Sequence, residues 1–372
     1  MKTVAAVLRA VSEARPYTQS RPMQLEDVEL PGPREGELLV RIEAAGVCHS
    51  DLSVVDGSRV RPLPMALGHE AAGVVEAIGA GVAGVRPGDH VVLAFVPSCG
   101  HCGECSSGRP ALCMPGAAAN GAGALLHGPP LLKDASGGAL FHHLGISGFA
   151  RHAVIARESA VVIPRDVPLP TAALFGCAVL TGVGAVLNTA RVRAGQSVAV
   201  FGLGGVGLAA VMGARLAGAA NVIAVDPVEA KRAVAREAGA TQVMTPEQAG
   251  AIREQGGVDF AFEAAGVPPV LEAAFRALKR GGTAVAMGLP HPSKTVTLPA
   301  LAFAGEGKSL VGSYMGSSDP QRDIPAYLKA WREGRLPVEK LHTATLPLSA
   351  INEAFEQLAS GAAIRQILLP HA

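Results

Sequence analysis

The 372-residue sequence lacks an excess of charge of either sign, a long apolar segment near its start and an internal repeat. Its 32 Lys and Arg are matched by 31 Asp and Glu, without a basic cluster. Because a protein that binds nucleic acid must neutralise many phosphates, nucleic acid is excluded as a partner. The apolar residues 4–8 are followed by Arg9, so this stretch is too short for a secretory signal or a membrane span. We therefore expect a cytoplasmic protein with no membrane partner.

Hydrophobic residues make up 49% of the chain, enough for a large core and, at this length, for two domains. The chain has only six cysteines. In a reducing compartment, cysteines serve metal binding or thiolate chemistry more often than disulfides. The cysteines therefore direct attention to a metal.

The first third of the chain contains short β-type runs separated by Gly and Pro, which predicts a compact, barrel-like β domain. The clearest runs are residues 38–42, 72–78 and 90–94. Residues 115–128 are mostly Gly, Ala and other small residues, which bury little apolar area, so we expect a surface loop there.

After residue 181, buried-strand patterns alternate with helix patterns, which predicts a parallel, doubly wound sheet. The tail from residue 324 reads as helical and ends in a strand at 364–369. The expected strands are 197–201, 222–225, 258–262 and 283–287, and the expected helices are 206–216, 229–237 and 269–278.

Four of the cysteines, Cys99, Cys102, Cys105 and Cys113, follow the spacing C-x2-C-x2-C-x7-C. Four thiolates on one tight loop suit closed tetrahedral zinc coordination, and the glycines between them let the backbone turn around the metal. The site would be structural, with no open coordination position. An iron–sulfur cluster and four independent buried thiols are the alternatives.

A glycine-rich run, Gly202-Leu203-Gly204-Gly205-Val206-Gly207, directly follows an expected strand and opens an apolar helix. Such a turn lets a pyrophosphate approach the backbone N–H groups at the helix start. Asp226 ends the next expected strand, where a carboxylate accepts from both ribose hydroxyls and repels a 2′-phosphate. The sequence thus predicts NAD in preference to NADP.

The other two cysteines, Cys48 and Cys177, and His69 would each pass singly for packed core residues. Together with their neighbours they resemble the zinc-dependent medium-chain dehydrogenase/reductase family, specifically alcohol dehydrogenases with a long loop after the structural zinc lobe. The resemblance runs nearly end to end. It is carried by Cys48-His49-Ser50-Asp51, Gly68-His69-Glu70, the four-cysteine lobe, Cys177, the glycine-rich run and Ser360-Gly361 leading to Ile364-Arg365.

The resemblance implies a GroES-like β-rich catalytic domain at 1–178 and 322–372, and a Rossmann NAD-binding domain at 179–321. All six cysteines become zinc ligands, so two zinc ions are expected per subunit. Cys48, His69 and Cys177 leave the fourth position of a catalytic zinc open for water or substrate. The zinc would lower the pKa of the alcohol, whose alkoxide passes a hydride to the nicotinamide.

The same resemblance gives roles to neighbouring residues. Asp51 would hold the His69 imidazole in its tautomer, and Ser50 would take the proton of the alcohol unless it is only a turn residue. Lys231 and Arg365 could otherwise be solvated surface charges. The remaining assignments place Glu70 beside the metal, Thr181 and Val206 near the nicotinamide, Lys231 at a ribose and Arg365 at the pyrophosphate.

Four positions bear on how this chain would bind its cofactor and substrate and pass on the proton. His49 stands where many relatives have an arginine against the pyrophosphate, so we expect faster NADH release. Ser53 replaces a histidine that ends the proton relay in some relatives. Phe95 matches an aromatic wall of the substrate pocket and favours apolar or aromatic alcohols. Arg59 occupies a normally apolar rim, where it would attract an anionic substrate tail or remain a solvated loop cation.

The predicted function is hydride transfer between NAD and a primary or secondary alcohol, or the matching aldehyde or ketone. One alternative is a thiol-dependent formaldehyde dehydrogenase, since long-loop relatives include such enzymes. An alternative of another class is a protein that binds zinc and dinucleotide without catalysis. The long loop at 114–143 favours a homodimer over a tetramer, by analogy with the family.

Overall fold

The computed structural model describes all 372 residues, which form two compact units. The first contains Met1–Cys177, Pro320–Pro325 and His342–Ala372, and the second contains Ala178–Asp319 and Ala326–Leu341. No single helix is long and apolar enough to cross a membrane, although the bent pair Leu169–Gly176 and Ala178–Ala190 reaches that length and composition together.

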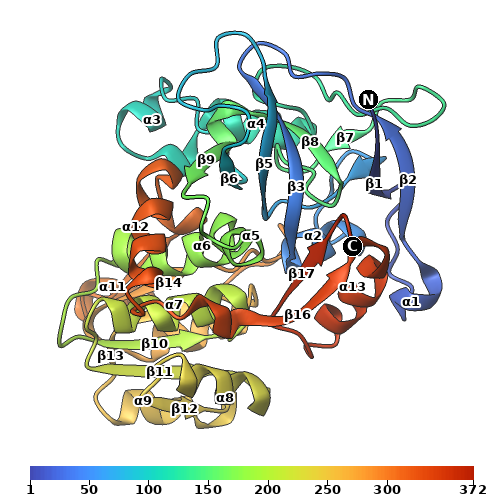
Figure 1. The fold of residues 1–372 in the computed structure, drawn as a ribbon. Helices are drawn as coiled ribbons and strands as arrows, with labels where there is room; N and C mark the ends of the chain where they lie inside the picture. The colour runs from blue at the N-terminus through green and yellow to red at the C-terminus, as the bar shows by residue number, and fades with distance from the viewer. The chain divides into compact units, whose positions relative to one another are not determined.

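The first unit is built on two sheets, as expected for a GroES-like β domain (Figure 1). One has the strand order β2-β1-β4-β7; the other has the order β16-β17-β3-β5-β6-β9, with β8 also pairing to β3. The strands are β1 (Lys2–Leu8), β2 (Met23–Glu29), β3 (Glu37–Val47), β4 (Met65–Ala66), β5 (Ala71–Ile78), β6 (His90–Leu93), β7 (Phe141–His142), β8 (His152–Ala156), β9 (Ala160–Ile163), β16 (His342–Pro347) and β17 (Arg365–Leu369).

Strand β3 is the spine of the larger sheet because it pairs with β5, β8 and β17. Alternate residues Val40, Ile42 and Ala44 are fully buried, as the period of two in a strand requires. Its last residue, Val47, leads directly into the first predicted zinc ligand. The helices of this unit are short: α1 (Tyr17–Ser20), α2 (His49–Val55), α3 (Gly103–Ser106), α4 (Met114–Ala122), α5 (Leu169–Ala173) and α13 (Ile351–Ala359).

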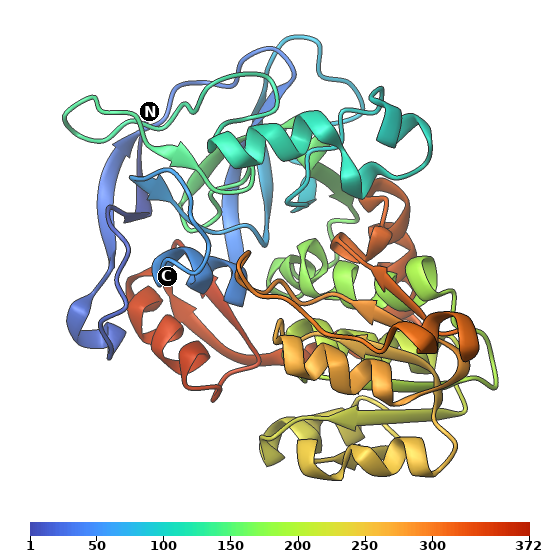
Figure 2. The same cartoon turned by 180° about the vertical axis from the view of Figure 1, so that it is seen from behind.

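The expected surface loop at 115–128 is wrong for its first part, because helix α4 runs through Met114–Ala122 (teal in Figure 2). Alanine is the best helix former, and the Cys113 Sγ accepts a hydrogen bond from the Gly116 N–H at 3.4 Å. A Cβ on Gly116 would come within 2.3 Å of a backbone carbonyl oxygen, so the small residue permits close packing. The helix ends at Gly123, whose φ of +64° suits a C-terminal cap.

The second unit contains a six-stranded parallel sheet of order β12-β11-β10-β13-β14-β15, which confirms the predicted doubly wound Rossmann fold. The strands are β10 (Ser197–Phe201), β11 (Asn221–Val225), β12 (Gln242–Met244), β13 (Val258–Glu263), β14 (Leu278–Ala286) and β15 (Ser309–Gly312). The helices are α6 (Ala178–Gly184), α7 (Gly205–Leu216), α8 (Glu229–Glu237), α9 (Gly250–Glu254), α10 (Pro268–Arg276) and α11 (Ala300–Gly305), followed by most of α12 (Pro320–Arg332).

Strand β10 lies between β11 and β13, so the strand order reverses beside it. In open parallel sheets, ligands bind at the carboxyl ends of strands at such a position. The predicted helix 269–278 ends earlier, at Arg276, because Leu278 already pairs with Val258 in the sheet.

Candidate active site

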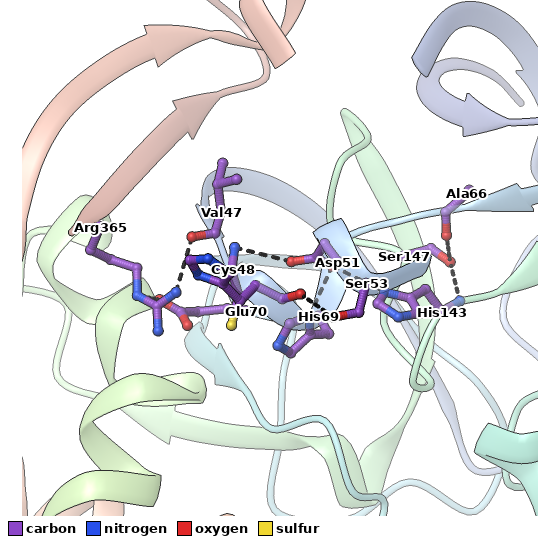
Figure 3. A network of polar contacts seen from close by, with 11 residues as sticks. Val47, Cys48, Asp51, Ser53, Ala66, His69, Glu70, His143, Ser147 and Arg365 are labelled. Atoms are coloured by element: carbon purple, nitrogen blue, oxygen red, sulfur yellow. Dashed lines mark hydrogen bonds and ion pairs between the residues drawn. The ribbon is translucent and has the colours of Figure 1, made fainter. Parts of the chain in front are cut away.

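The three predicted catalytic zinc ligands come together in the first unit, and Figure 3 shows two of them, Cys48 and His69, with their polar neighbours. Cys48 follows β3, His69 lies between β4 and β5, and Cys177 precedes α6. Their ligand atoms all lie within 4.8 Å of one another, and each residue is at most 6% exposed. Two sulfurs and one ring nitrogen in a buried place form a donor set suited to a divalent zinc ion.

The electrostatics of the two thiols also suit a cation. A hydrogen bond from Cys177, together with the nearby charges of Arg365 and His69, holds the pKa of Cys48 well below its usual range. The same hydrogen bond and burial raise the pKa of Cys177. A lowered pKa at Cys48 suits a metal ligand, because a bound metal requires its thiol ligands deprotonated.

Asp51 sits behind this donor set and is fully buried. Its Oδ1 lies 2.9 Å from the His69 Nδ1, and its Oδ2 accepts a hydrogen bond from the Cys48 N–H at 3.2 Å, which also caps α2. Burial opposes ionisation, but the charge on His69 and contacts with His143 and His69 keep the pKa of Asp51 below its usual value. An Nδ1–H directed at Asp51 leaves the Nε2 of His69 available to a metal.

Glu70 adds a second buried carboxylate beside the site. Burial raises its pKa to about 7, although the charge of Arg365 opposes the shift. The two groups form an ion pair at 3.6 Å, and Arg365 also donates a hydrogen bond to the Val47 carbonyl at 3.0 Å. Neither carboxylate oxygen of Glu70 receives a hydrogen bond, and Gly46 makes room for it, since a Cβ there would lie 2.3 Å from Oε1. A buried carboxylate whose oxygens accept no hydrogen bond is consistent with a cation nearby.

The four-cysteine lobe places all four sulfurs within 4.8 Å of one another. Backbone N–H groups point at the sulfurs: the Cys102 N–H bonds to the Cys99 Sγ at 3.4 Å, and the Cys99 N–H bonds to the Cys113 Sγ at 3.3 Å. Hydrogen bonds from the backbone of Cys105 and Met114 lower the pKa of Cys102 to about 6. The lobe fits a closed, four-thiolate metal site.

The glycine-rich run forms the turn between β10 and α7 in the second unit. Gly202 has a φ of +90°, and a Cβ on Gly207 would lie 1.8 Å from the Gly202 carbonyl oxygen, so both positions require glycine. A Cβ on Gly204 would meet no atom within 4 Å. The turn therefore leaves open space above Gly204, where a ligand could approach the backbone.

Four of the other residues predicted around the cofactor lie in the second unit, whereas His49 and Arg365 lie in the first. Asp226 follows β11 and is 6% exposed; its carboxylate accepts hydrogen bonds from the Leu203 N–H at 2.8 Å and the Val228 N–H at 2.9 Å. Asp226 thus lies directly against the glycine-rich turn. Thr181 is buried on α6, whereas Val206 on α7 and Lys231 on α8 are half-buried.

The remaining predicted residues, apart from Arg365, are His49, Ser50, Ser53, Phe95 and Arg59, which also lie in the first unit. His49 and Ser50 open α2, where His49 is exposed and Ser50 half-buried. The Ser53 hydroxyl donates a hydrogen bond to the His49 carbonyl at 2.8 Å. Phe95 is buried with its ring edge-on to His69, at a centroid distance of 5.6 Å. Arg59 is half-buried in the turn after α2.

Sequence reasoning missed His143, which is 1% exposed and packs edge-on against His69 with ring centroids 5.5 Å apart. Its Nδ1 lies 3.1 Å from the Asp51 Oδ1. The available signal was the pair His142-His143 within an apolar stretch, because two neighbouring imidazoles are seldom buried without a partner.

Comparisons with known proteins identify the family. Residues 34–165 match the alcohol dehydrogenase GroES-like domain, and residues 205–332 match the zinc-binding dehydrogenase family. The chain is 39% identical to an NDMA-dependent alcohol dehydrogenase of Amycolatopsis methanolica, over 99% of both chains. It is also 39% identical to a geraniol dehydrogenase of Castellaniella defragrans, over 98% of this chain and 97% of the relative.

Among solved structures, benzyl alcohol dehydrogenase from Acinetobacter calcoaceticus is similar over 99% of both chains, with a TM-score of 0.92 and 32% identity. These relatives match the chain along its whole length, through both the β domain and the Rossmann sheet. The chain therefore belongs to the zinc-dependent medium-chain dehydrogenase/reductase family, as an enzyme of the alcohol dehydrogenase type that interconverts alcohols and aldehydes.

Proposed function

We propose that the protein is an NAD-dependent alcohol dehydrogenase whose reaction takes place at a zinc ion held by Cys48, His69 and Cys177. The observation that carries the proposal is the approach of two sulfurs and a ring nitrogen to within 4.8 Å in a buried site. Three protein ligands are the number that a catalytic zinc takes, so Cys48, His69 and Cys177 could hold the ion and still admit the substrate oxygen. When bound, the zinc supplies Lewis-acid polarisation of that oxygen, and the nicotinamide accepts the hydride.

The protein's own residues then orient groups and move the proton. Asp51 holds the His69 ring by its Nδ1–H, so that the ring cannot turn away from the site. Ser50, two residues after Cys48, takes the proton of the alcohol. The Ser53 hydroxyl already donates to the His49 carbonyl, so we assign the outer end of the relay to water.

The preference for NAD over NADP rests on Asp226. Its buried carboxylate follows β11 and accepts from the backbone of the glycine-rich turn, a position from which it would bond ribose hydroxyls and repel a 2′-phosphate. Asp226→Asn removes the charge and keeps an acceptor for the turn. We expect the NAD-to-NADP ratio of kcat/KM to fall by about tenfold or more, since removing a like-charge contact is worth on the order of 1–2 kcal/mol. An unchanged ratio would count against this assignment.

A second, structural zinc is proposed at Cys99, Cys102, Cys105 and Cys113, which makes two zinc ions per chain. The four sulfurs lie within 4.8 Å of one another, and all six cysteines of the chain are free thiols. Free thiols at both sites suit a reducing compartment such as the cytoplasm. Elemental analysis of the purified enzyme would give the metal content, with iron measured alongside zinc.

The substrate class proposed is an alcohol whose carbon adjoins an alkene or an aromatic ring. Two relatives are named for geraniol and for benzyl alcohol, and both alcohols have this feature. The buried Phe95 ring beside His69 supplies an apolar aromatic wall for such a group. We expect kcat/KM for both alcohols to exceed that for ethanol.

One set of assays tests the proposal. Alcohols are offered with NAD, NADP and NDMA in parallel, the last because a relative is named for its dependence on NDMA. Cys48→Ala should lose turnover and one zinc while keeping the lobe zinc. Turnover that survives this change would contradict the proposal, as would inactivity of the fully metallated protein towards every alcohol, which would favour a non-catalytic binding role.

Two further measurements address the expected alternatives. NADH formation from formaldehyde that needs an added thiol would favour the thiol-dependent formaldehyde dehydrogenase, because its substrate is the thiol adduct. Light scattering tests the homodimer that we propose by analogy with the family, and a tetramer is the competing result.

A further inference from the structure

His143 lies close to the catalytic machinery without belonging to the predicted ligand set. Its Nδ1 is 3.1 Å from the Asp51 Oδ1, the same oxygen that the His69 Nδ1 approaches at 2.9 Å (Figure 3). The contact is within hydrogen-bonding distance but lacks hydrogen-bond alignment, so the ring nitrogen is held close to the carboxylate oxygen without a well-aligned bond. Asp51 is thus approached by two imidazoles on one oxygen and by the Cys48 N–H on the other.

The loop that carries His143 is built to hold it in place. The Ser147 hydroxyl accepts a hydrogen bond from the His143 N–H at 3.1 Å and donates one to the Ala66 carbonyl at 2.9 Å. The backbone N–H groups of Ile146 and Ser147 donate hydrogen bonds to the His143 carbonyl at 3.1 and 3.2 Å. The loop is thereby anchored next to β4, close to the segment that carries His69.

The backbone of this loop is strained. Leu144 and Ser147 have φ values of +49° and +53°, a region that side-chain-bearing residues seldom occupy. Each such residue costs free energy, and strain of this kind persists where the surroundings fix the conformation, often next to a functional site. The loop therefore adopts an unfavourable conformation that places an imidazole against Asp51.

A buried carboxylate needs this kind of support. Asp51 is fully buried, and an ionised carboxylate away from water is costly unless several donors surround it. With His69 alone on Oδ1, the carboxylate could turn about its side-chain torsion. The ring of His143 occupies the adjacent side of Oδ1 and also packs edge-on against His69, so it limits the movement of both groups.

We propose that His143 is a positioning residue for the catalytic metal site: it holds the Asp51 carboxylate so that His69 keeps its Nε2 directed to the metal. The inference rests on the proposed zinc site at Cys48, His69 and Cys177. Partners that orient a ligating histidine are worth about 10–100-fold in metal affinity, and His143 acts one contact further out. Its removal should therefore cost about 3–10-fold in affinity for the catalytic zinc.

The experiment compares His143→Phe, which keeps a flat ring without a donor, with His143→Asn, whose amide nitrogen can stand in for Nδ1. Zinc loss from the metallated enzyme to a chelator is followed for both metals of the chain, and the lobe zinc serves as the internal reference for folding. We expect His143→Phe to lose the catalytic zinc about 3–10-fold more readily, and His143→Asn to stay within about twofold of wild type. Both variants should keep the lobe zinc.

A double-mutant cycle shows whether the effect passes through Asp51. In an Asp51→Asn background, His143→Phe should add no further loss of the catalytic zinc, because the contact it removes is already weakened. Wild-type zinc retention in His143→Phe, a His143→Asn variant as poor as His143→Phe, or a full additional loss in the Asp51→Asn background would each overturn the inference. A wild-type enzyme with zinc only in the lobe would instead contradict the proposed function.

Discussion

Two alanine substitutions in the glycine-rich turn should separate ligand binding from folding. Gly204 has φ −72° and ψ −172°, which alanine also adopts, and its added methyl group would meet no atom within 4 Å. Gly204→Ala should therefore leave the free energy of unfolding unchanged or raise it by about 0.4–1 kcal/mol, because the unfolded chain loses freedom. Gly207→Ala would press its methyl group to 1.8 Å from the Gly202 carbonyl oxygen. It should destabilise the fold by about 1–3 kcal/mol or more.

For cofactor binding, the substitution expected to have little effect on stability, Gly204→Ala, is the one expected to do the damage. The open space above Gly204 is where a pyrophosphate would approach the backbone, so a methyl group there keeps the phosphate oxygens from the N–H groups at the start of α7. We expect the Kd for NADH to rise by about 10–100-fold in Gly204→Ala, which corresponds to about 1.4–2.8 kcal/mol.

The assays are urea unfolding for stability and fluorescence titration for NADH. Gly250→Ala at the start of α9 is the matched control, since its methyl group also meets nothing within 4 Å and no cofactor contact is proposed there. If Gly204→Ala bound NADH as tightly as the control, the assignment of the pyrophosphate to this turn would be refuted, whatever its stability.

Three more predictions follow from single residues. Burial lowers the pKa of His142 from 6.5 to about 4, so the unfolded chain binds a proton that the folded chain does not. Stability present above pH 6.5 should fall by about 3 kcal/mol towards pH 4, and urea unfolding of His142→Phe should lack that part of the decline; an identical decline would contradict the assignment. His49→Arg should slow NADH release in stopped-flow displacement by about 3–10-fold, whereas equal off-rates would remove the idea. Arg59→Ala should lower kcat/KM about tenfold for a carboxylated alcohol and leave a neutral one unchanged; equal effects on both would identify Arg59 as a solvated loop cation.

The structural features that could be predicted best from the sequence are those whose signal lies within one short segment. The four-cysteine spacing fits within one loop, and four of the six parallel strands follow from apolar runs that alternate with helix patterns, so both could be predicted without tertiary information; β12 and β15 were not predicted. Helix α4 could not, because its small residues resemble a loop, and two of its supports are tertiary: a sulfur at its start and close packing against a backbone carbonyl. Composition alone does not reveal either support.

The candidate site shows the same division. Cys48 and Asp51 share one short motif, so their relation could be predicted, and His69 and Glu70 are neighbours in another. The approach of His143 to Asp51 depends on a strained loop far along the chain, and no periodicity indicates where that loop returns. The pairing of Arg365 with Glu70 likewise depends on β17 joining β3 in the sheet.

Helix α4 connects the four-cysteine lobe to the segment that carries Phe95, the proposed wall of the substrate pocket. It begins after Cys113, whose sulfur accepts the Gly116 N–H, and near its end the buried Asn120 donates a hydrogen bond to the Phe95 carbonyl at 2.8 Å. The Phe95 ring in turn stands against His69. Oxidation of the half-buried lobe thiols Cys99, Cys102 and Cys105 would release the proposed structural metal, weaken the start of the helix and loosen the segment that carries Phe95. An oxidant could thus impair turnover without reaching the residues that carry out the chemistry.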